Sequence, residues 1–202
     1  MDGFIVSKIK EKKQEKENKL LEAAYDLFTE KGINNTAIQD IVNKAGVAKG
    51  TFYLYFKDKY DVQNKLIIKK SQYLFTKAVE SLDKNVIKNF DDQIIYIINY
   101  VIDILKEDEV LINFISKDLS LGVYTNGVSN LFTNEKIGIQ ELFMSGVKEH
   151  NIRLKNPEVT LFMIIELSSS TIFTSIIKKK PLPIDEYKPF LYNIIRSLIN
   201  EK

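Results

Sequence analysis

The chain from Thr36 to Lys59 reads TAIQDIVNKAGVAKGTFYLYFKDK, with apolar residues at helical spacing on either side of Gly46. The first pattern predicts a helix over residues 36–45, which Thr36 opens in the order Thr-x-x-Gln of a capping box. The second pattern predicts a helix over residues 48–56. Glycine adopts the left-handed conformation that reverses a chain within a few residues. The stretch therefore predicts a helix-turn-helix, a motif that places its second helix in the major groove of DNA.

The second of these helices has two different faces. Val47, Phe52 and Phe56 supply the inward, apolar side. The ends and the outer side carry residues that suit the edge of a nucleic acid: Lys49, Gly50, Thr51, Tyr53 and Tyr55. Gly50 has two interpretations, crowding between helices of the protein or close approach of a partner to the backbone.

Charge supports this interpretation locally and not globally. The chain has 29 Lys and Arg against 27 Asp and Glu, so its net charge is only +2. Residues 44–59, in contrast, contain four lysines and one aspartate. Residues 1–15 are predicted to form a basic tail, which is either solvated or in contact with a phosphate or a minor groove.

These residues resemble the amino-terminal signature of TetR-family transcriptional regulators, and the resemblance covers roughly residues 16–62. It implies contacts with phosphates or bases by seven residues: Thr36, Lys49, Gly50, Thr51, Tyr53, Tyr55 and Lys59. Two residues depart from the family pattern. Ala48 stands where the family often has Ser or Thr, so the helix lacks an N-cap that is usually worth ~1 kcal/mol. Tyr55 stands where His is frequent.

The rest of the chain is also predicted to be helical, because Gly and Pro are sparse and apolar residues recur at helical spacing. The fold class expected is all-α, a three-helix DNA-binding bundle over 16–62 followed by a larger helical domain over 63–202. A fourth helix is expected to begin near residue 58 and to connect the two. The other predicted helices cover residues 91–106, 109–121, 130–150, 157–179 and 185–200.

One such bundle recognises few bases, so specific binding requires two copies about ~34 Å apart, or a multiple of that distance. A homodimer is therefore expected. The helices over 157–179 and 185–200 are the candidates for its interface, because they carry more apolar surface than a monomer hides. By resemblance, they pair with their counterparts as a four-helix bundle. The alternative is that both apolar stripes serve only the intramolecular core.

By resemblance, the intervening helices form a pocket for a small-molecule effector, whose binding changes the separation of the two recognition helices. The fourth helix is the expected lever. Glu166 is predicted to be either a ligand contact or a structural hydrogen-bonding group, because a buried carboxylate is costly unless it is paired. The candidate ligand contacts are Tyr96, Asn99, Tyr100, Asp103 and Glu166.

Other classes of protein fit the sequence less well. With no cysteine, a single histidine at His150 and no phosphate-binding glycine loop, the chain lacks a recognisable catalytic or metal-binding constellation. We expect no enzyme, no metal, no cofactor and no membrane span, and a cytoplasmic location. The expected function is a repressor that binds a palindromic operator and is released by the effector. The alternative is a helical adaptor that uses the same bundle for protein or membrane contacts.

Overall fold

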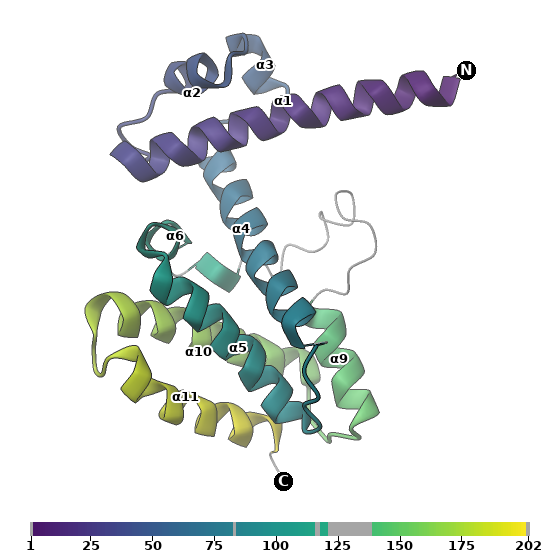
Figure 1. Ribbon diagram of the computed structural model, residues 1–202, viewed down its shortest axis with the longest axis vertical. Coiled ribbons are helices and arrows are strands. Elements are labelled where there is room, and N and C mark those ends of the chain that lie inside the picture. The colour runs from purple at the N-terminus through teal and green to yellow at the C-terminus, as the bar shows by residue number, and fades with distance from the viewer. Residues whose placement is uncertain (1, 83, 116–117, 121–138, 201–202) are drawn as a thin grey trace. The chain divides into compact units, whose positions relative to one another are not determined.

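A computed structural model describes residues 2–82, 84–115, 118–120 and 139–200 (Figure 1). Within these ranges every regular element is a helix, as the all-α prediction requires. The chain divides into two compact units, residues 1–66 and 67–202. The first unit contains α1 (Asp2–Lys31), α2 (Ile38–Ala45), α3 (Lys49–Tyr53) and the start of α4 (Lys59–Leu82). The second contains the rest of α4, then α5 (Phe90–Glu107), α6 (Glu109–Ile115), η1 (Asp118–Ser120), α9 (Ile139–Glu149), α10 (Pro157–Phe173), the π-helix η2 (Thr174–Lys178) and α11 (Ile184–Ile199).

The first unit is a small bundle around one apolar core. Gly46 has a φ of 67°, the left-handed conformation that ends α2 and turns the chain into α3, as the sequence predicted. Contacts between α1 and α2 and between α2 and α3 hold the three helices together. The core residues at this junction are fully or almost fully buried: Leu20, Ala24, Phe28, Ile41, Val42, Phe52, Phe56 and Val62.

Three details of this bundle differ from the prediction. α1 begins at Asp2, so residues 2–15 continue the first helix and do not form a separate tail. The N-cap of α2 is Ala37 and not Thr36, because the Asp40 carboxylate accepts a hydrogen bond from Ala37 N at 3.1 Å. α3 ends at Tyr53, and Leu54 beyond it is 75% exposed. The predicted end at residue 56 was wrong because Leu54 and Tyr55 lie in a turn.

The second unit buries an aliphatic core that is centred on α5. This helix contributes Ile94, Ile97, Val101 and Ile102, which pack with residues of α9, α10 and α11. The predicted helix over 109–121 ends at Ile115, and η1 follows it. The predicted helix over 130–150 is described from Ile139, and its residues 130–138 lie outside the described ranges.

α10 and η2 together cover Pro157–Lys178, a helix long and apolar enough to cross a membrane by length and composition alone. No membrane span was predicted from the sequence. Leu161, Ile164, Ile165 and Ile172 of this helix are buried in the core of the second unit. Core helices of soluble proteins have the same composition, so the finding is weak evidence for a membrane segment.

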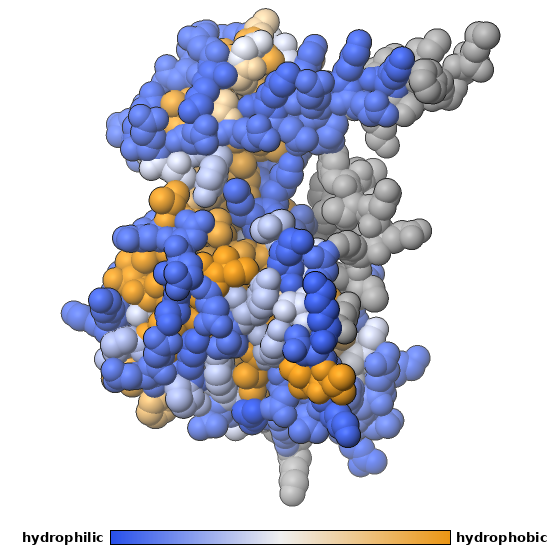
Figure 2. Space-filling view, in the orientation of Figure 1, coloured by the Kyte–Doolittle hydropathy of each residue, from blue (hydrophilic) through white to orange (hydrophobic). Residues whose placement is uncertain are grey.

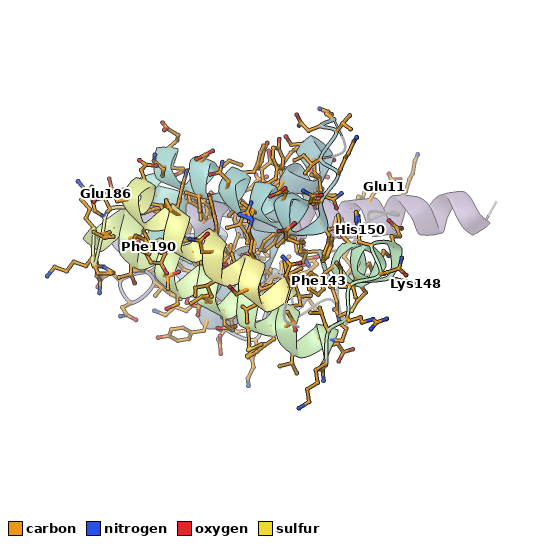
Figure 3. All side chains as sticks on the ribbon, turned by 90° about the horizontal axis from the view of Figure 1, so that it is seen from below. Glu11, Phe143, Lys148, His150, Glu186 and Phe190 are labelled. Carbon is orange, nitrogen blue, oxygen red and sulfur yellow. The ribbon has the colours of Figure 1, made fainter. Side chains whose placement is uncertain are left out.

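Gly146 of α9 lies directly against the ring of Phe90. A Cβ at this glycine would meet Phe90 Cε2 at 2.1 Å. Phe90 is 2% exposed, and its ring centroid lies 5.3 Å from that of Phe143 and 5.7 Å from that of His150. Figure 3 labels Phe143 and His150 along α9. His150 itself is exposed directly after the end of α9.

We expect Gly146→Ala to lower the free energy of unfolding by about 1–2 kcal/mol. Overpacking costs roughly 1–3 kcal/mol, and the higher helix propensity of alanine offsets up to about 1 kcal/mol. Urea denaturation measures the change. The matched control is Gly50→Ala in α3, where a Cβ meets nothing within 4 Å and no loss of stability is expected. Equal stability of the two variants would contradict this packing.

Candidate nucleic-acid interface and ligand cavity

The exposed face of α3 is held in place by an aromatic cluster beneath it. Phe52 is fully buried, and its ring packs edge-on against that of Tyr53 at a centroid distance of 5.4 Å. The Phe56 ring lies tilted against Phe52 at a centroid distance of 5.5 Å. Tyr53 nevertheless remains 54% exposed. Lys49 and Gly50 are exposed, and Thr51 is half-buried. The polar residues of α3 therefore form one outward face above a fixed apolar base.

Lys49 is available for a partner outside the protein. It is exposed, and its ammonium makes no hydrogen bond or ion pair among the described residues. Ala48 precedes it as the N-cap and provides no side-chain hydrogen bond, which confirms the missing cap.

Gly50 has open space around its Cα. A Cβ there would meet no atom within 4 Å, and its φ does not lie in the left-handed region. Crowding inside the first unit therefore does not require a glycine at this position. Of the two interpretations of Gly50, the close approach of an external partner remains.

The local basic charge is smaller than the sequence suggests. Lys44 forms an ion pair with Asp26 at 3.0 Å. Lys59 donates from Nζ to the backbone oxygens of Asn34 and Thr36, each at 3.1 Å. Lys49 and Lys57 are exposed lysines that face no ion-pair partner in the described part of this segment. Lys57 was included in the local charge count but was not predicted to contact DNA. Because it is exposed, it is a further candidate for a phosphate contact.

Thr36 and Lys59 have structural roles that the resemblance does not reveal. Thr36 is 1% exposed, and its hydroxyl donates to Gly32 O at 2.9 Å. Together with the hydrogen bonds of Lys59, this fixes the loop between α1 and α2. The Thr36 side chain is therefore buried and is not part of the exposed face of α3.

Tyr55 lies beyond the end of α3 and is half-buried. Burial raises the pKa of its hydroxyl, and the charge of Glu17 adds to the effect. Its ring centroid lies 6.2 Å from that of Phe56. Tyr55 therefore belongs more to the base of the face than to its outer surface.

The first unit also contains a buried ion pair that was not predicted from the sequence. Glu17 of α1 is 6% exposed, and its carboxylate pairs with Lys65 of α4. The Lys65 ammonium also lies 5.6 Å from the ring centroid of Phe56. The pair therefore connects α1, α4 and the segment after α3. Its signal in the sequence was the spacing of Glu17, which places it on the same helical face as Leu20, Leu21 and Ala24.

The predicted ligand contacts on α5 have partners within the second unit. The Tyr96 hydroxyl lies 2.7 Å from Ser81 Oγ and accepts from Asn85 Nδ2 at 3.0 Å. Asn99 accepts from the Tyr192 hydroxyl at 2.7 Å. Tyr100 is half-buried against the core.

Asp103, another predicted contact, forms an ion pair with Lys188 of α11 at 2.9 Å. Asn99 Nδ2 also donates to its carboxylate, at 2.8 Å. Glu166 is half-buried on α10, and its backbone oxygen accepts from Ser169. Asn99 and Asp103 therefore connect α5 to α11, whereas the hydrogen bond to Glu166 lies within α10.

Tyr192 supplies a pH test of this connection. Burial raises its pKa from 10.0 to about 12, with the charges of Asp103 and Asp185 contributing. A folded pKa above the unfolded pKa stabilises the fold below about pH 10, and this contribution disappears as the pH rises toward 12. We expect the difference in unfolding free energy between wild type and Tyr192→Phe to be constant up to pH 10 and then to decrease. If urea denaturation shows the same difference in unfolding free energy between wild type and Tyr192→Phe at every pH, the raised pKa of Tyr192 is contradicted.

A cavity of about 40 Å³ lies elsewhere in the second unit. Residues of α4, α5, η1, α9 and α10 line it, among them Phe75, Ile98, Leu119, Ile139 and Leu161. None of the five predicted ligand contacts lines this cavity. The prediction favoured polar residues of α5, whereas the cavity faces the aliphatic side of the same helix. Among the described residues, no group of three or more acidic or histidine side chains could hold a metal.

Apolar side chains also reach the surface of the second unit (Figure 2). On α10 and α11 these exposed residues are Val159, Phe162, Met163, Phe190 and Ile194, each between 41% and 61% exposed. Figure 3 shows Phe190 along α11. The two helices pack against each other, so their exposed apolar residues belong to neighbouring elements. Both helices also contribute buried residues to the core.

The helical bundle with its exposed recognition helix places the chain among helix-turn-helix proteins. Residues 20–64 match the model of the family described as bacterial regulatory proteins, tetR family. This part of the chain, which contains the helix-turn-helix, is therefore similar to TetR-family regulators.

The chain is also similar to curated relatives in sequence and to solved structures in fold. The chain is 36% identical over 110 residues to the HTH-type transcriptional regulator YvdT of Bacillus subtilis, and the match covers 54% of this chain and 52% of that protein. It therefore spans about half the length of that relative. A TetR-family regulator from Syntrophomonas wolfei has a TM-score of 0.64 at 20% identity, covering 92% of this chain and 95% of the other. FadR from Bacillus subtilis in complex with stearoyl-CoA has a TM-score of 0.56 at 18% identity, covering 91% and 98%.

Proposed function

We propose that the protein is a cytoplasmic, ligand-responsive transcriptional repressor that binds a palindromic DNA operator as a homodimer. The observation that carries the proposal is the outward face of α3, where Lys49, Gly50 and Tyr53 are exposed above a buried aromatic base. Backbone exposure at Gly50 permits close approach to DNA, and Lys49 provides a positive charge for a phosphate or a base edge. A dimer that occupies a promoter represses without contacting the polymerase.

Six residues form the proposed DNA-binding surface: Lys49, Gly50, Thr51, Tyr53, Lys57 and Tyr55 at its margin. Lys59 acts on this surface indirectly, because it fixes the loop before α2. Thr36 does the same through Gly32. A protein adaptor that used this face would bind through apolar contact and would respond little to salt. Phosphate contacts give a steep salt dependence instead.

The first test is the salt dependence of binding to the DNA upstream of the gene. We expect Lys49→Ala to weaken binding and to lower the slope of log affinity against log salt by about 0.9, the value for one phosphate contact. Fluorescence anisotropy with a labelled duplex measures both quantities. Lys148→Ala is the matched control, because it removes the same charge from an exposed position on α9. If the slope of log affinity against log salt is the same for Lys49→Ala and wild type, Lys49 does not contact a phosphate.

The exposed apolar residues of α10 and α11 support the homodimer. Surface patches of this kind on neighbouring helices are typical of interfaces between subunits. A two-fold symmetric dimer formed through this patch would contain two copies of α3, one for each half-site of a palindrome. The patch coincides with the helices that the sequence proposed for dimerisation.

The apolar cavity is the proposed effector site. α4 begins in the first unit and contributes Phe75 to the cavity, so a rearrangement of the cavity reaches the DNA-binding bundle through one continuous helix. An effector must bind one conformation better than the other, and coupling of ~1–3 kcal/mol changes DNA affinity by ~5–150-fold. The FadR structure with stearoyl-CoA supports a role for this helical fold in effector binding. A gel-shift titration of the repressor–operator complex with candidate effectors tests the release step.

A further inference from the structure

A buried hydroxyl without a hydrogen-bond partner lies in the wall of the cavity. Ser168 of α10 is 6% exposed, and its Oγ has no partner in the described structure. Its neighbour Ser169 also lines the cavity, but the Ser169 hydroxyl donates to Glu166 O at 3.2 Å. Buried polar groups are normally hydrogen-bonded, because burial removes their hydrogen bonds to water. The Ser168 hydroxyl is therefore available to a molecule that enters the cavity.

The rest of the described wall is apolar. Phe75, Ile98, Val101 and Leu161 are representative, and no charged side chain is among the described residues that line the cavity. A charged group that entered would lose its hydration without gaining a counter-charge from the described lining residues. A hydroxyl or carbonyl group would lose much less, and Ser168 offers it a hydrogen bond.

We propose that the cavity selects an uncharged, largely apolar molecule with one hydroxyl or carbonyl group, which forms a hydrogen bond with Ser168 Oγ. The inference rests on the proposed function, in which this cavity is the effector site. At about 40 Å³ the cavity is far smaller than the ~150 Å³ that accommodates benzene in an engineered apolar cavity. The molecule therefore displaces wall side chains as it binds, which makes its affinity depend on the conformation of the surrounding helices.

Three probes with the same eight-carbon chain test the proposed ligand class. Octan-1-ol carries a neutral hydroxyl, octylammonium a positive charge and octanoate a negative charge. Isothermal titration calorimetry on the full-length protein at neutral pH measures their affinities. We expect octan-1-ol to bind at least about tenfold more tightly than either ion. Equal or tighter binding of an ion, or no binding of octan-1-ol, overturns the proposal.

Two neighbouring serines test the role of Ser168. Ser168→Ala is expected to weaken octan-1-ol binding about three- to tenfold, the usual effect of one neutral hydrogen bond. Ser169→Ala is the matched control, because its hydroxyl already has a backbone partner. A loss in Ser168→Ala no larger than in Ser169→Ala contradicts the hydrogen bond. If Ser168→Ala does not fold, the order of the three probes on the wild-type protein decides the proposal.

Binding of the same samples to operator DNA, without probe, separates the two proposals. If the protein binds operator DNA but does not bind octan-1-ol, the proposed ligand class is overturned and the proposed DNA-binding function stands. The expected order of probes without DNA binding overturns the proposed function and supports the chemistry of the cavity. Octan-1-ol binding, ion rejection and DNA binding together support both.

Discussion

Gly50→Leu is expected to reduce affinity for the operator by at least about a hundredfold. The side chain would project from the exposed face of α3, where the protein itself leaves open space. It would separate the helix from the groove and remove the base contacts that distinguish specific from non-specific binding, a difference of about 10³–10⁷ in affinity. Fluorescence anisotropy with the operator duplex measures the loss.

Stability of the same variant serves as the control for this prediction. A Cβ at this exposed position meets no neighbour within 4 Å. The leucine should therefore leave the free energy of unfolding unchanged or raise it, because leucine favours helix more than glycine by roughly 1 kcal/mol. Gly50→Ala should be at least as stable as wild type and should lose less DNA affinity than Gly50→Leu. Wild-type affinity in a folded Gly50→Leu protein would show that α3 does not approach DNA closely.

Phe190→Glu is expected to convert the dimer to a monomer at micromolar concentration. Phe190 is 61% exposed on α11, and the proposed two-fold axis places two copies of it in one interface. The substitution would bury an unpaired charge in each subunit, which typically costs several kcal/mol. Since specific binding requires two half-sites, operator affinity should fall at least about a hundredfold together with the dimer.

Sedimentation equilibrium measures the oligomeric state of this variant. Val110→Glu is the matched control, because Val110 is 53% exposed but lies on α6, outside the proposed interface. Its dimerisation and DNA affinity should match those of wild type. A Phe190→Glu protein that remains dimeric would place the interface on another surface.

The helix-turn-helix could be predicted because its determinants are local. The spacing of Ile41, Val42, Phe52 and Phe56 and the position of Gly46 are readable along the chain, and the structure buries these apolar residues and turns at this glycine. The cap of α2 was predicted wrongly, because the Thr-x-x-Gln pattern indicated Thr36 whereas the Asp40 carboxylate makes the capping contact. The Thr36 hydroxyl donates to Gly32 O in the loop before α2, and the capping contact is made by Asp40.

The ligand site could not be predicted in the same way. Polar residues on α5 suggested Tyr96, Asn99 and Asp103, yet hydrogen bonds and ion pairs with α4 and α11 occupy them. A cavity is a shape produced by several helices, and Ile98 or Ser168 has no distinguishing pattern along the chain. The lack of a partner for Ser168 emerges only when its neighbours are placed.

Footprinting of the protein on its own upstream DNA tests the central claim most directly. The account predicts two protected half-sites on one face of the duplex, related by an inverted repeat and centred about ~34 Å apart or a multiple of that distance. Both half-sites should lose protection with Gly50→Leu and with Phe190→Glu. Protection of a single site, uniform coverage without half-sites, or no protection at low salt would contradict a dimer that reads DNA with α3.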